Sequence, residues 1–469
     1  MWKKREWNKK KVKSELRKTL IIRSFKLVHL LASVGVFVLS WTLFVNHYGI
    51  QSPKRYVLLV YAMYTLAFAY LSRVFNAYLI EYAKPGDIIL SLSLAAIISG
   101  AVVYMAVSIA WNQWHIPVVG PLYLALQILL NIVWAKLGNR LYYKLYTISS
   151  AVVVYRKQAD LKRLKDIERF DKKFDITKTL ENPKSVEEII DALENTDTLF
   201  MVGVEATIRN GVAQYCVANN ITCYFLPHIG DVLMMGGKHM QAFSVPIMRV
   251  TPASLNPEYA ALKRFLDILL SLIGILVLWP FMLITAAVIK LYDHGPALYK
   301  QTRLTTGGKE FKILKFRSMR VDAEKDGVAR LSTGENDDRI TPIGKVIRAI
   351  RFDELPQLFN ILKGDMSIVG PRPERPEIAA QYEETLPAFR LRLQVKAGLT
   401  GYAQLFGRYN TDPYDKLELD LIYINKINIL LDLQIDCMTI KVLFQKESTE
   451  GIKEGNIVAI DNDEYLDNK

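Results

Sequence analysis

Cysteine is scarce in this 469-residue chain, which contains only Cys216, Cys223 and Cys437. Three thiols are too few for a secreted domain held together by several disulfides, and an odd number fits a reducing compartment. Hydrophobic residues make up 51% of the chain, and its mean hydropathy is +0.13. This composition excludes intrinsic disorder and collagen-like repeats, and the length favours roughly three domains.

Charge is absent from four long stretches in the first third of the chain, at 27–45, 56–71, 88–111 and 116–135. A membrane-spanning helix needs about 17–25 mostly apolar residues. A secretory signal peptide does not fit, because its apolar region has only about 7–15 residues and a small-residue cleavage site follows. The pattern therefore predicts four transmembrane helices within 19–145. A buried soluble helical bundle is the alternative.

The first 18 residues contain nine Lys or Arg and two Glu. Such a segment binds nucleic acid or an anionic membrane surface, and the apolar runs after it favour the membrane, so no nucleic-acid partner is expected. Because Lys and Arg concentrate on the cytoplasmic side, 1–18 is predicted to be cytosolic, and four spans return the chain to the cytosol after about residue 140. The single His29 is interpreted as interfacial or solvated, without a ligand role.

Residues 150–250 are less hydrophobic and alternate between two patterns. Strands are predicted near 151–155, 198–204 and 221–226, and helices near 161–170, 186–193 and 208–218. Alternating strands and helices are typical of a parallel α/β sheet, here Rossmann-like. A dinucleotide site would need a glycine-rich loop after the first strand, but the chain reads Arg-Lys-Gln-Ala there. We therefore predict a structural, dimerising or regulatory module, and Cys216 and Cys223 as core residues. A homodimer through this module or the spans remains a prediction.

A fifth apolar run, 268–289, is long enough to span a membrane. Both of its flanks are basic, with Lys263 and Arg264 before it, and Pro280 near its middle is expected to kink a helix. A kinked re-entrant helix over 263–291 that returns to the cytosolic face satisfies both observations, with Asp267 in the interface beside Arg264. A plain kinked fifth span is the alternative.

The polar segment 292–445 is dense in cations and unusual short motifs. Between residues 300 and 320 lie Lys300, Arg303, Lys309, Lys312, Lys315, Arg317 and Arg320. Such a cluster holds anionic lipid headgroups or a nucleotide diphosphate. Asp353 and Glu354 are predicted to open a helix, so that one carboxylate faces a substrate and the other a metal. Pro371 and Pro373 fix the backbone around Arg372, which suits a bidentate phosphate contact.

Several motifs occur in order: Lys-Phe-Arg-Ser-Met at 315–319, Asp-Glu-Leu-Pro-Gln at 353–357, Lys-Gly-Asp-Met-Ser at 363–367, Val-Gly-Pro-Arg-Pro at 369–373 and Gly-Leu-Thr-Gly at 398–401. Glycines in such motifs are expected to allow close approach of a ligand to the backbone. With these motifs, residues 258–445 resemble the bacterial sugar transferases, the polyprenyl-phosphate hexose-1-phosphate transferases that are also called monotopic phosphoglycosyl transferases. Four spans and an α/β module ahead of the catalytic part resemble the long members of that family.

The resemblance implies transfer of a hexose 1-phosphate from a UDP-sugar to undecaprenyl phosphate, with release of UMP, as the first membrane step of capsule or exopolysaccharide synthesis. The sugar would be glucose or galactose, and the site would lie on the cytosolic face of the bacterial plasma membrane. A mainly helical α+β catalytic domain at the membrane interface is implied for 258–445, followed by an acidic tail at 446–469. The residues that this resemblance implicates are Asp353 as nucleophile, Glu354 as the Mg²⁺ ligand beside it, Arg303, Lys315, Arg317, Arg348, Arg372 and Arg408 for phosphate or nucleotide, and Asp420 nearby.

Two other classes remain open at this point. One is another membrane enzyme that uses lipid phosphates, such as a phosphatidyl-alcohol transferase, although the several-aspartate motif of that class is not visible. The other is a non-catalytic assembly or regulatory protein of polysaccharide synthesis. The sequence departs from the family pattern at Trp279-Pro280, where Ser-Pro is usual, and at Ala397, where proline is usual.

Overall fold

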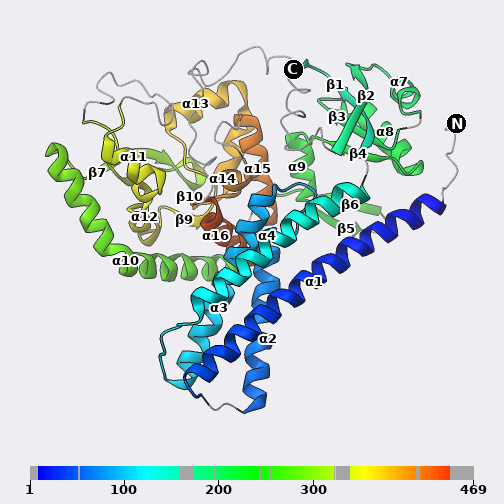
Figure 1. The fold of residues 1–469 in the computed structure, drawn as a ribbon. Helices are drawn as coiled ribbons and strands as arrows, with labels where there is room; N and C mark the ends of the chain where they lie inside the picture. Colours follow the sequence, from blue (N-terminus) through cyan, green and yellow to red (C-terminus); the bar gives the residue numbers. More distant parts are fainter. Residues whose placement is uncertain are drawn as a thin grey trace. The chain divides into compact units, whose positions relative to one another are not determined.

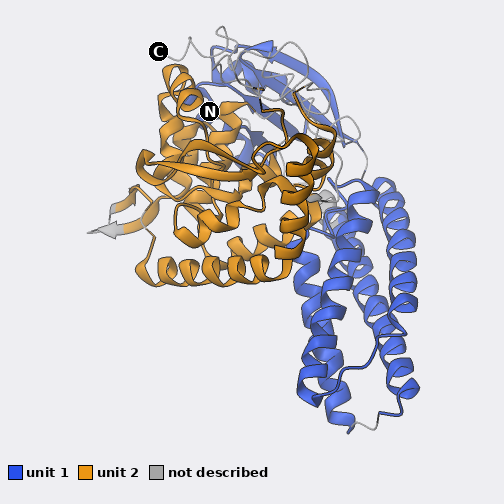
Figure 2. Ribbon diagram, turned by 90° about the vertical axis from the view of Figure 1, so that its left-hand side faces the viewer, with its two compact units in different colours: residues 1–226 blue, residues 227–469 orange. Residues whose placement is uncertain are grey.

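The computed structural model describes residues 9–50, 53–146, 148–158, 164, 173–194, 196–242, 245–253, 255–321, 323, 339–407 and 412–443. The chain divides into two compact units, residues 1–226 and 227–469 (Figure 2). Sequence patterning placed residues 227–250 in the α/β module, whereas their contacts group them with the second unit. The predicted helix near 161–170, apart from residue 164, and the acidic tail at 446–469 lie outside the described residues.

The first unit begins with long helices (Figure 1): α1 (Lys9–His47), α2 (Lys54–Val74), α3 (Pro85–Trp111) and α4 (Gly120–Leu145). Each is long and apolar enough to cross a membrane. They cover the four uncharged runs, but the last helix begins four residues later than its run. Pro121 lies in its first turn, where the missing N–H costs no helical hydrogen bond.

His29 corrects one expectation, because its side chain is buried with only 1% exposed. Its Nδ1 lies 3.1 Å from the Tyr78 hydroxyl, and its Nε2 lies 3.1 Å from the side-chain amide of Asn131. A polar ring placed among apolar helices needs such partners, since an unpaired polar group there is costly. His29 therefore belongs to the interior of the helical region.

The α/β part of the first unit contains β1 (Ser149–Tyr155), β2 (Phe174–Glu181), β3 (Thr198–Val202) and β4 (Thr222–Phe225), with helices α7 (Val186–Ala192) and α8 (Ala206–Ala218). The four strands form a parallel sheet in the order β2-β1-β3-β4. The predicted strands and these two helices are confirmed within a residue or two at most ends. The edge strand β2 was not predicted, because it is polar and mostly exposed.

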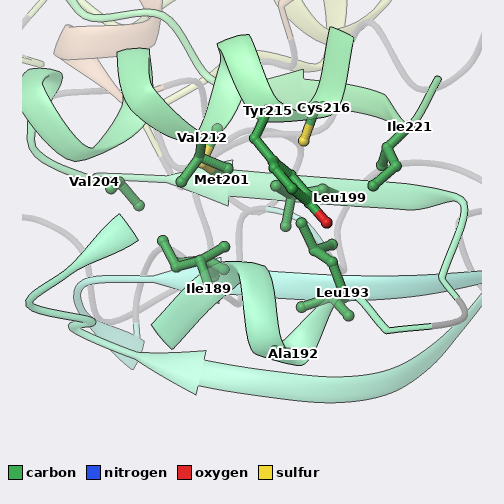
Figure 3. Close-up of a cluster of buried hydrophobic side chains, with 12 residues drawn as sticks. Ile189, Ala192, Leu193, Leu199, Met201, Val204, Val212, Tyr215, Cys216 and Ile221 are labelled. Carbon is green, nitrogen blue, oxygen red and sulfur yellow. The ribbon is translucent and has the colours of Figure 1, made fainter. Parts of the chain in front are cut away.

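A core cluster packs between this sheet and its helices (Figure 3). Ile189 and Leu193 from the α7 region meet Leu199 and Met201 of β3, and all four are almost fully buried. Cys216 lies in the same cluster with 0% exposure, as the sequence predicted for a core residue.

The second unit holds these helices and strands: α9 (Ile229–Met235), β5 (Lys238–Ala242), β6 (Val245–Arg249), α10 (Pro257–Asp293), β7 (Leu298–Leu304), β8 (Glu310–Phe316), α11 (Pro342–Ala349), α12 (Gln357–Lys363), β9 (Ser367–Val369), α13 (Pro376–Thr385), β10 (Gly398–Thr400), α14 (Tyr402–Phe406), α15 (Pro413–Lys426) and α16 (Ile429–Leu443). Strands β5–β6 and β7–β8 pair antiparallel, and β9–β10 pair parallel. A buried apolar cluster joins β9 to α9, α13, α15 and α16. The unit is mainly helical with short sheets, as predicted.

Helix α10 is one continuous helix that contains Pro280, and Figure 1 shows it bending along its length. Proline removes one helical hydrogen bond and crowds the carbonyl four residues earlier, which gives a physical cause for such a bend. In the most apolar 18-residue stretch of α10, only 11% is buried inside the protein. Asp267 is not interfacial as expected: it is 5% exposed and accepts hydrogen bonds from Ser367 Oγ and the Ile368 amide.

Three glycines of the sequence motifs pack against one another. A Cβ atom at Gly398 would lie closer than 3.0 Å to both the amide nitrogen and the carbonyl oxygen of Gly370, and one at Gly401 would collide with the same carbonyl. The close approach expected here is therefore between backbone segments at the β9–β10 junction, within the protein itself.

Gly398→Ala is expected to destabilise the protein by about 1–3 kcal/mol, because the added methyl group forces the two strands apart. Gly230→Ala in α9 is the matched control, since a Cβ there meets no atom within 4 Å. Thermal unfolding of both variants in the same detergent measures the difference. An unchanged unfolding temperature for Gly398→Ala would contradict this packing.

Candidate active site

The carboxylate pair lies in a tight turn between two helices. After α11, Arg351 adopts a left-handed conformation with φ of 54°, and a 3₁₀ turn over Phe352–Glu354 follows. Left-handed backbone at a non-glycine residue costs about 1–3 kcal/mol and occurs mainly where function or packing requires it. Asp353 and Glu354 were expected in the first turn of a helix; they precede α12 instead.

Strand β8 is fixed beside this turn through Asn360 of α12, which is 3% exposed. Its Oδ1 accepts from the Leu314 amide at 2.9 Å, and its Nδ2 donates to the Lys312 carbonyl at 2.8 Å. Two hydrogen bonds to strand backbone lock the register of helix against strand. They bring Lys315, the next residue along β8, to the carboxylate pair.

Glu354 is the anionic centre of the site. It is 9% exposed, and its Oε1 accepts from Lys315 Nζ at 3.2 Å and from Arg372 Nη2 at 2.7 Å. Arg351 Nη1 lies 3.9 Å from Oε2. Burial by itself would raise the pKa of Glu354, but the nearby positive charges of Arg372, Lys315 and Arg351 outweigh it and hold this pKa far below its usual range.

Asp353 has the opposite electrostatic shift. Burial, together with the negative charge of Glu354, raises its pKa, although Lys315 and Arg348 act against the rise. Two neighbouring carboxyl groups whose environments push their pKa values apart are suited to different tasks. Glu354 is a fixed anion, and Asp353 is the more basic and more exposed carboxylate of the two.

Two predicted phosphate-binding residues flank the pair. Burial lowers the pKa of the Lys315 ammonium, while the negative charge of Glu354 opposes that shift. Arg348 in α11 donates from Nε to Ser318 Oγ at 2.8 Å, which orients its guanidinium. The positive charge of Arg348 also lowers the pKa of Asp353. The structure thus brings Lys315, Arg348 and Arg372 together around Asp353 and Glu354.

Arg303 and Arg317 have different surroundings. Arg317 binds Asp293 at the end of α10 through both Nη atoms, and its Nε donates to the Pro296 carbonyl at 2.7 Å. Its guanidinium is therefore engaged in joining the end of α10 to the residue that follows β8. Arg303 donates to the Pro373 carbonyl at 3.1 Å and to Gln301 Oε1 at 2.6 Å.

The basic residues of α10 that precede its apolar run bind the helix to the rest of its unit. Lys263 Nζ lies 2.7 Å from Asp432 Oδ2 in α16. Arg264 donates to the Ile361 and Leu362 carbonyls at 2.6 and 2.7 Å, at the C-terminus of α12. A cation at this position adds hydrogen bonds to carbonyls at the end of the helix and interacts favourably with the helix dipole.

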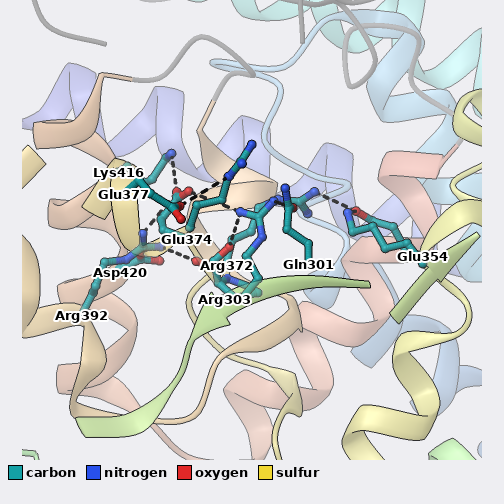
Figure 4. A network of polar contacts seen from close by, with 12 residues as sticks. Gln301, Arg303, Glu354, Arg372, Glu374, Glu377, Arg392, Lys416 and Asp420 are labelled. Atoms are coloured by element: carbon teal, nitrogen blue, oxygen red, sulfur yellow. Dashed lines mark hydrogen bonds and ion pairs between the residues drawn. The ribbon is translucent and has the colours of Figure 1, made fainter. Parts of the chain in front are cut away.

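Asp420 lies in α15, is 1% exposed and pairs with Arg392 at 2.7 Å (Figure 4). Burial raises its pKa, against the positive charge of Arg392. Arg408 lies outside the described residues. Arg351, Arg392 and Glu374 were not selected from the sequence. For Arg392 and Glu374 the reason is that an ion pair between residues far apart in the chain is visible only once the chain has folded.

The carboxylate pair suits Mg²⁺ by the chemistry of its donors. Mg²⁺ prefers oxygen ligands and usually takes one or two protein carboxylates, with substrate phosphates and water completing its shell. Across the part of the chain that the structure describes, no group of three or more His, Cys, Asp or Glu side chains is arranged for a metal. The pair therefore fits an ion shared with a bound phosphate.

A carboxylate pair surrounded by cations lies in the helix turn just before α12, and the long apolar helix α10 is hydrogen-bonded to the C-terminus of α12. These features define a membrane-associated protein with a site suited to phosphate groups. The chain belongs to the bacterial sugar transferase family, whose model matches residues 258–446. Together with the long apolar helices, this family membership indicates an integral membrane protein of the bacterial plasma membrane.

Similar proteins carry related names. The chain is 38% identical over 231 residues to a UDP-N-acetylgalactosamine-undecaprenyl-phosphate N-acetylgalactosaminephosphotransferase of Aeromonas hydrophila, covering 49% of this chain and 53% of that protein. It is 35% identical to a UDP-glucose:undecaprenyl-phosphate glucose-1-phosphate transferase of Klebsiella pneumoniae, covering 50% and 51%. It is 45% identical to the exopolysaccharide production protein PSS of Rhizobium leguminosarum, covering 37% of this chain and 90% of that protein. The matches span about half the length of the first two relatives.

Proposed function

We propose that this protein transfers a hexose 1-phosphate from a UDP-sugar to undecaprenyl phosphate and releases UMP, as the first membrane step of capsule or exopolysaccharide synthesis. The observation that carries the proposal is the Asp353–Glu354 turn within the family-matched segment, with Lys315, Arg348 and Arg372 gathered around it. The relatives' names support a UDP-sugar as donor and undecaprenyl phosphate as acceptor.

The transfer would proceed in two displacements. An Asp353 carboxylate oxygen attacks the phosphorus that bears the sugar, a new P–O bond forms, and the P–O bond to UMP breaks. UMP leaves, and the sugar phosphate stays attached to Asp353. A phosphate oxygen of undecaprenyl phosphate then attacks the same phosphorus, which frees the carboxylate and gives undecaprenyl-diphosphate-sugar. Splitting the reaction in this way replaces one difficult step with two easier ones.

Two anions must approach each other in both displacements, so positive charge has to offset their repulsion. Arg348 and Arg372 would hold the diphosphate, and Lys315 would offset charge beside Asp353. Asp353 and Glu354 would hold Mg²⁺, which when bound supplies positive charge to the diphosphate oxygens. Glu354 also keeps Arg372 and Lys315 in place through the bonds to its Oε1.

Exposed apolar side chains near the site support a position at the membrane surface. Val346 in α11 is 63% exposed, Ile350 after it is 52% exposed, and Phe359 in α12 is 45% exposed. Amphipathic helices of this kind lie in the bilayer interface. The lipid phosphate is at that interface and UDP-sugar is in the cytosol, so we propose that the site faces the cytosol, with α10 re-entrant.

Cysteines introduced at both ends of α10 test this topology. In a background with Cys216, Cys223 and Cys437 replaced by serine, Glu258→Cys and His294→Cys are both expected to resist an impermeant thiol reagent applied outside intact cells. Both should react in inverted membrane vesicles. Labelling of one end from the outside would show that α10 crosses the membrane.

UMP release tests the proposed reaction. Purified protein with Mg²⁺ and undecaprenyl phosphate is offered UDP-glucose, UDP-galactose, UDP-N-acetylglucosamine or UDP-N-acetylgalactosamine. Release of UMP with one of these sugars, dependent on the lipid, supports the proposal and identifies the sugar, for which we favour glucose or galactose. No UMP with any donor from folded protein would favour a non-catalytic assembly role instead.

A further inference from the structure

Four consecutive carbonyls of segment 371–374, which carries Arg372, each accept a hydrogen bond, and the donors come from three other segments of the second unit. The Pro371 carbonyl accepts from the Gly398 amide at 2.9 Å, and the Glu374 carbonyl accepts from the Leu304 amide at 3.0 Å. Between them, the Arg372 carbonyl accepts from Arg392 Nη2 at 2.9 Å, and the Pro373 carbonyl accepts from Arg303 Nη1 at 3.1 Å. The segment is therefore fixed at every peptide group, in addition to the two prolines that restrict its φ angles.

Arg392 is the more deeply buried of the two arginine donors. Its side chain is 3% exposed, and it pairs with Glu374 at 3.3 Å and with Asp420 at 2.7 Å (Figure 4). Glu374 is held in turn by Lys416 at 2.9 Å. Although burial would raise the pKa of Glu374, Lys416 and Arg392 lower it to about 2, so this carboxylate is an anion at neutral pH.

Only a guanidinium fits the position of Arg392. It meets acceptors on three residues at once: two carboxylates and the Arg372 carbonyl. Arginine presents five donors in a rigid plane, whereas lysine presents one compact ammonium on a flexible chain. A lysine would keep the positive charge among Glu374 and Asp420 but could not also hold the carbonyl in the same geometry.

The bound carbonyl belongs to the residue whose side chain reaches the active site. The Arg372 side chain extends from the segment and is 40% exposed, and its Nη2 donates to Glu354 Oε1 at 2.7 Å. An exposed arginine side chain can adopt many rotamers, and binding a phosphate costs this freedom. A fixed backbone at Arg372 limits where its guanidinium can lie and so helps to place it for the substrate. We propose that Arg392 is a positioning residue that sets the Arg372 guanidinium against Glu354 through the Arg372 carbonyl and Glu374.

A kinetic cycle with Arg372 tests this inference, which rests on the proposed function. Arg392→Lys is expected to lower kcat/KM for the UDP-sugar about 10- to 100-fold. In an Arg372→Ala background the same change should lower it less than about 2-fold, because its effect passes through Arg372. Arg390→Lys is the matched control, since Arg390 lies in the same 3₁₀ segment, Pro387–Gln394, and is exposed. If the fold-losses in kcat/KM of Arg392→Lys and Arg372→Ala multiply in the double variant, the two residues act independently and the proposal is overturned.

Hydrogen–deuterium exchange gives a readout that does not need activity. Arg392→Lys should speed exchange of the amides in 370–375, while exchange in α16 stays as in the wild type and Arg390→Lys changes neither. Unchanged exchange in 370–375 would overturn the proposal even if no UDP-sugar proves to be a substrate. Should Arg392→Lys fail to fold, Arg303→Lys, which acts on the next carbonyl, must show the same faster exchange and the same dependence on Arg372.

Discussion

Asp353→Asn is expected to reduce UMP release by at least about 10³-fold, while the protein still inserts into the membrane and folds. The substitution keeps the shape of the side chain but removes the anionic oxygen that would form the bond to phosphorus. Because burial and the negative charge of Glu354 already raise the pKa of Asp353, the neutral amide relieves electrostatic strain in the folded state. Activity is thus expected to fall without a loss of stability.

The measurement is UMP release at saturating UDP-sugar, together with thermal unfolding of the same preparation. Asp191→Asn, an exposed aspartate of α7, is the matched control and should behave as the wild type. A denaturing gel after incubation with UDP-sugar that is radiolabelled in its sugar should show label on the wild type and none on Asp353→Asn. Turnover by Asp353→Asn within about 10-fold of the wild type would remove Asp353 as the nucleophile.

Glu354→Gln is expected to lower the rate about 10- to 100-fold and to raise the Mg²⁺ concentration needed for half-maximal activity. The change replaces one oxygen of the proposed metal ligand with an NH2 group and removes its negative charge. It also removes the anion that binds Lys315 and Arg372, so both cations lose a charged partner. Breaking a buried ion pair on one side is costly, so this variant should also unfold at a lower temperature.

A Mg²⁺ titration of UMP release, with Glu384→Gln as an exposed control in α13, separates these effects. A rate that falls with no change in the Mg²⁺ titration would leave Glu354 as an anchor for Arg372 and Lys315 and would remove its metal role. An unchanged rate and titration would remove both roles.

The helices of the first unit were predictable because hydrophobicity over some twenty residues is a local signal. Helix α10 extends well beyond its apolar run, since the polar residues Tyr259, Lys263 and Asp267 pack on other elements of the unit. Strand β2 gave no such signal, because an exposed edge strand needs few apolar residues. Its place in the sheet depends on pairing with β1, which is separated from it in sequence.

Individual residues of the candidate site were predictable mainly where they belong to, or lie close to, short sequence motifs. Asp353, Glu354, Lys315, Arg348 and Arg372 were selected from the sequence and lie together in the structure. The residues next to an arginine in sequence do not show which group its side chain binds. The sequence therefore could not show that Arg317 binds Asp293 whereas Arg348 lies near Asp353. Arg351 was missed for a similar reason: a left-handed φ is rarely signalled by arginine.

The two hydrogen bonds from Arg264 to the end of α12 have a mechanical consequence. They tie an apolar helix to the helix that follows the carboxylate turn, so the two move as one piece. A helix in lipid tilts or shifts in depth when the thickness of the bilayer changes. Such a tilt would pass through Arg264 to α12, and from there to the turn that carries Asp353, so the activity of the enzyme is expected to depend on bilayer thickness.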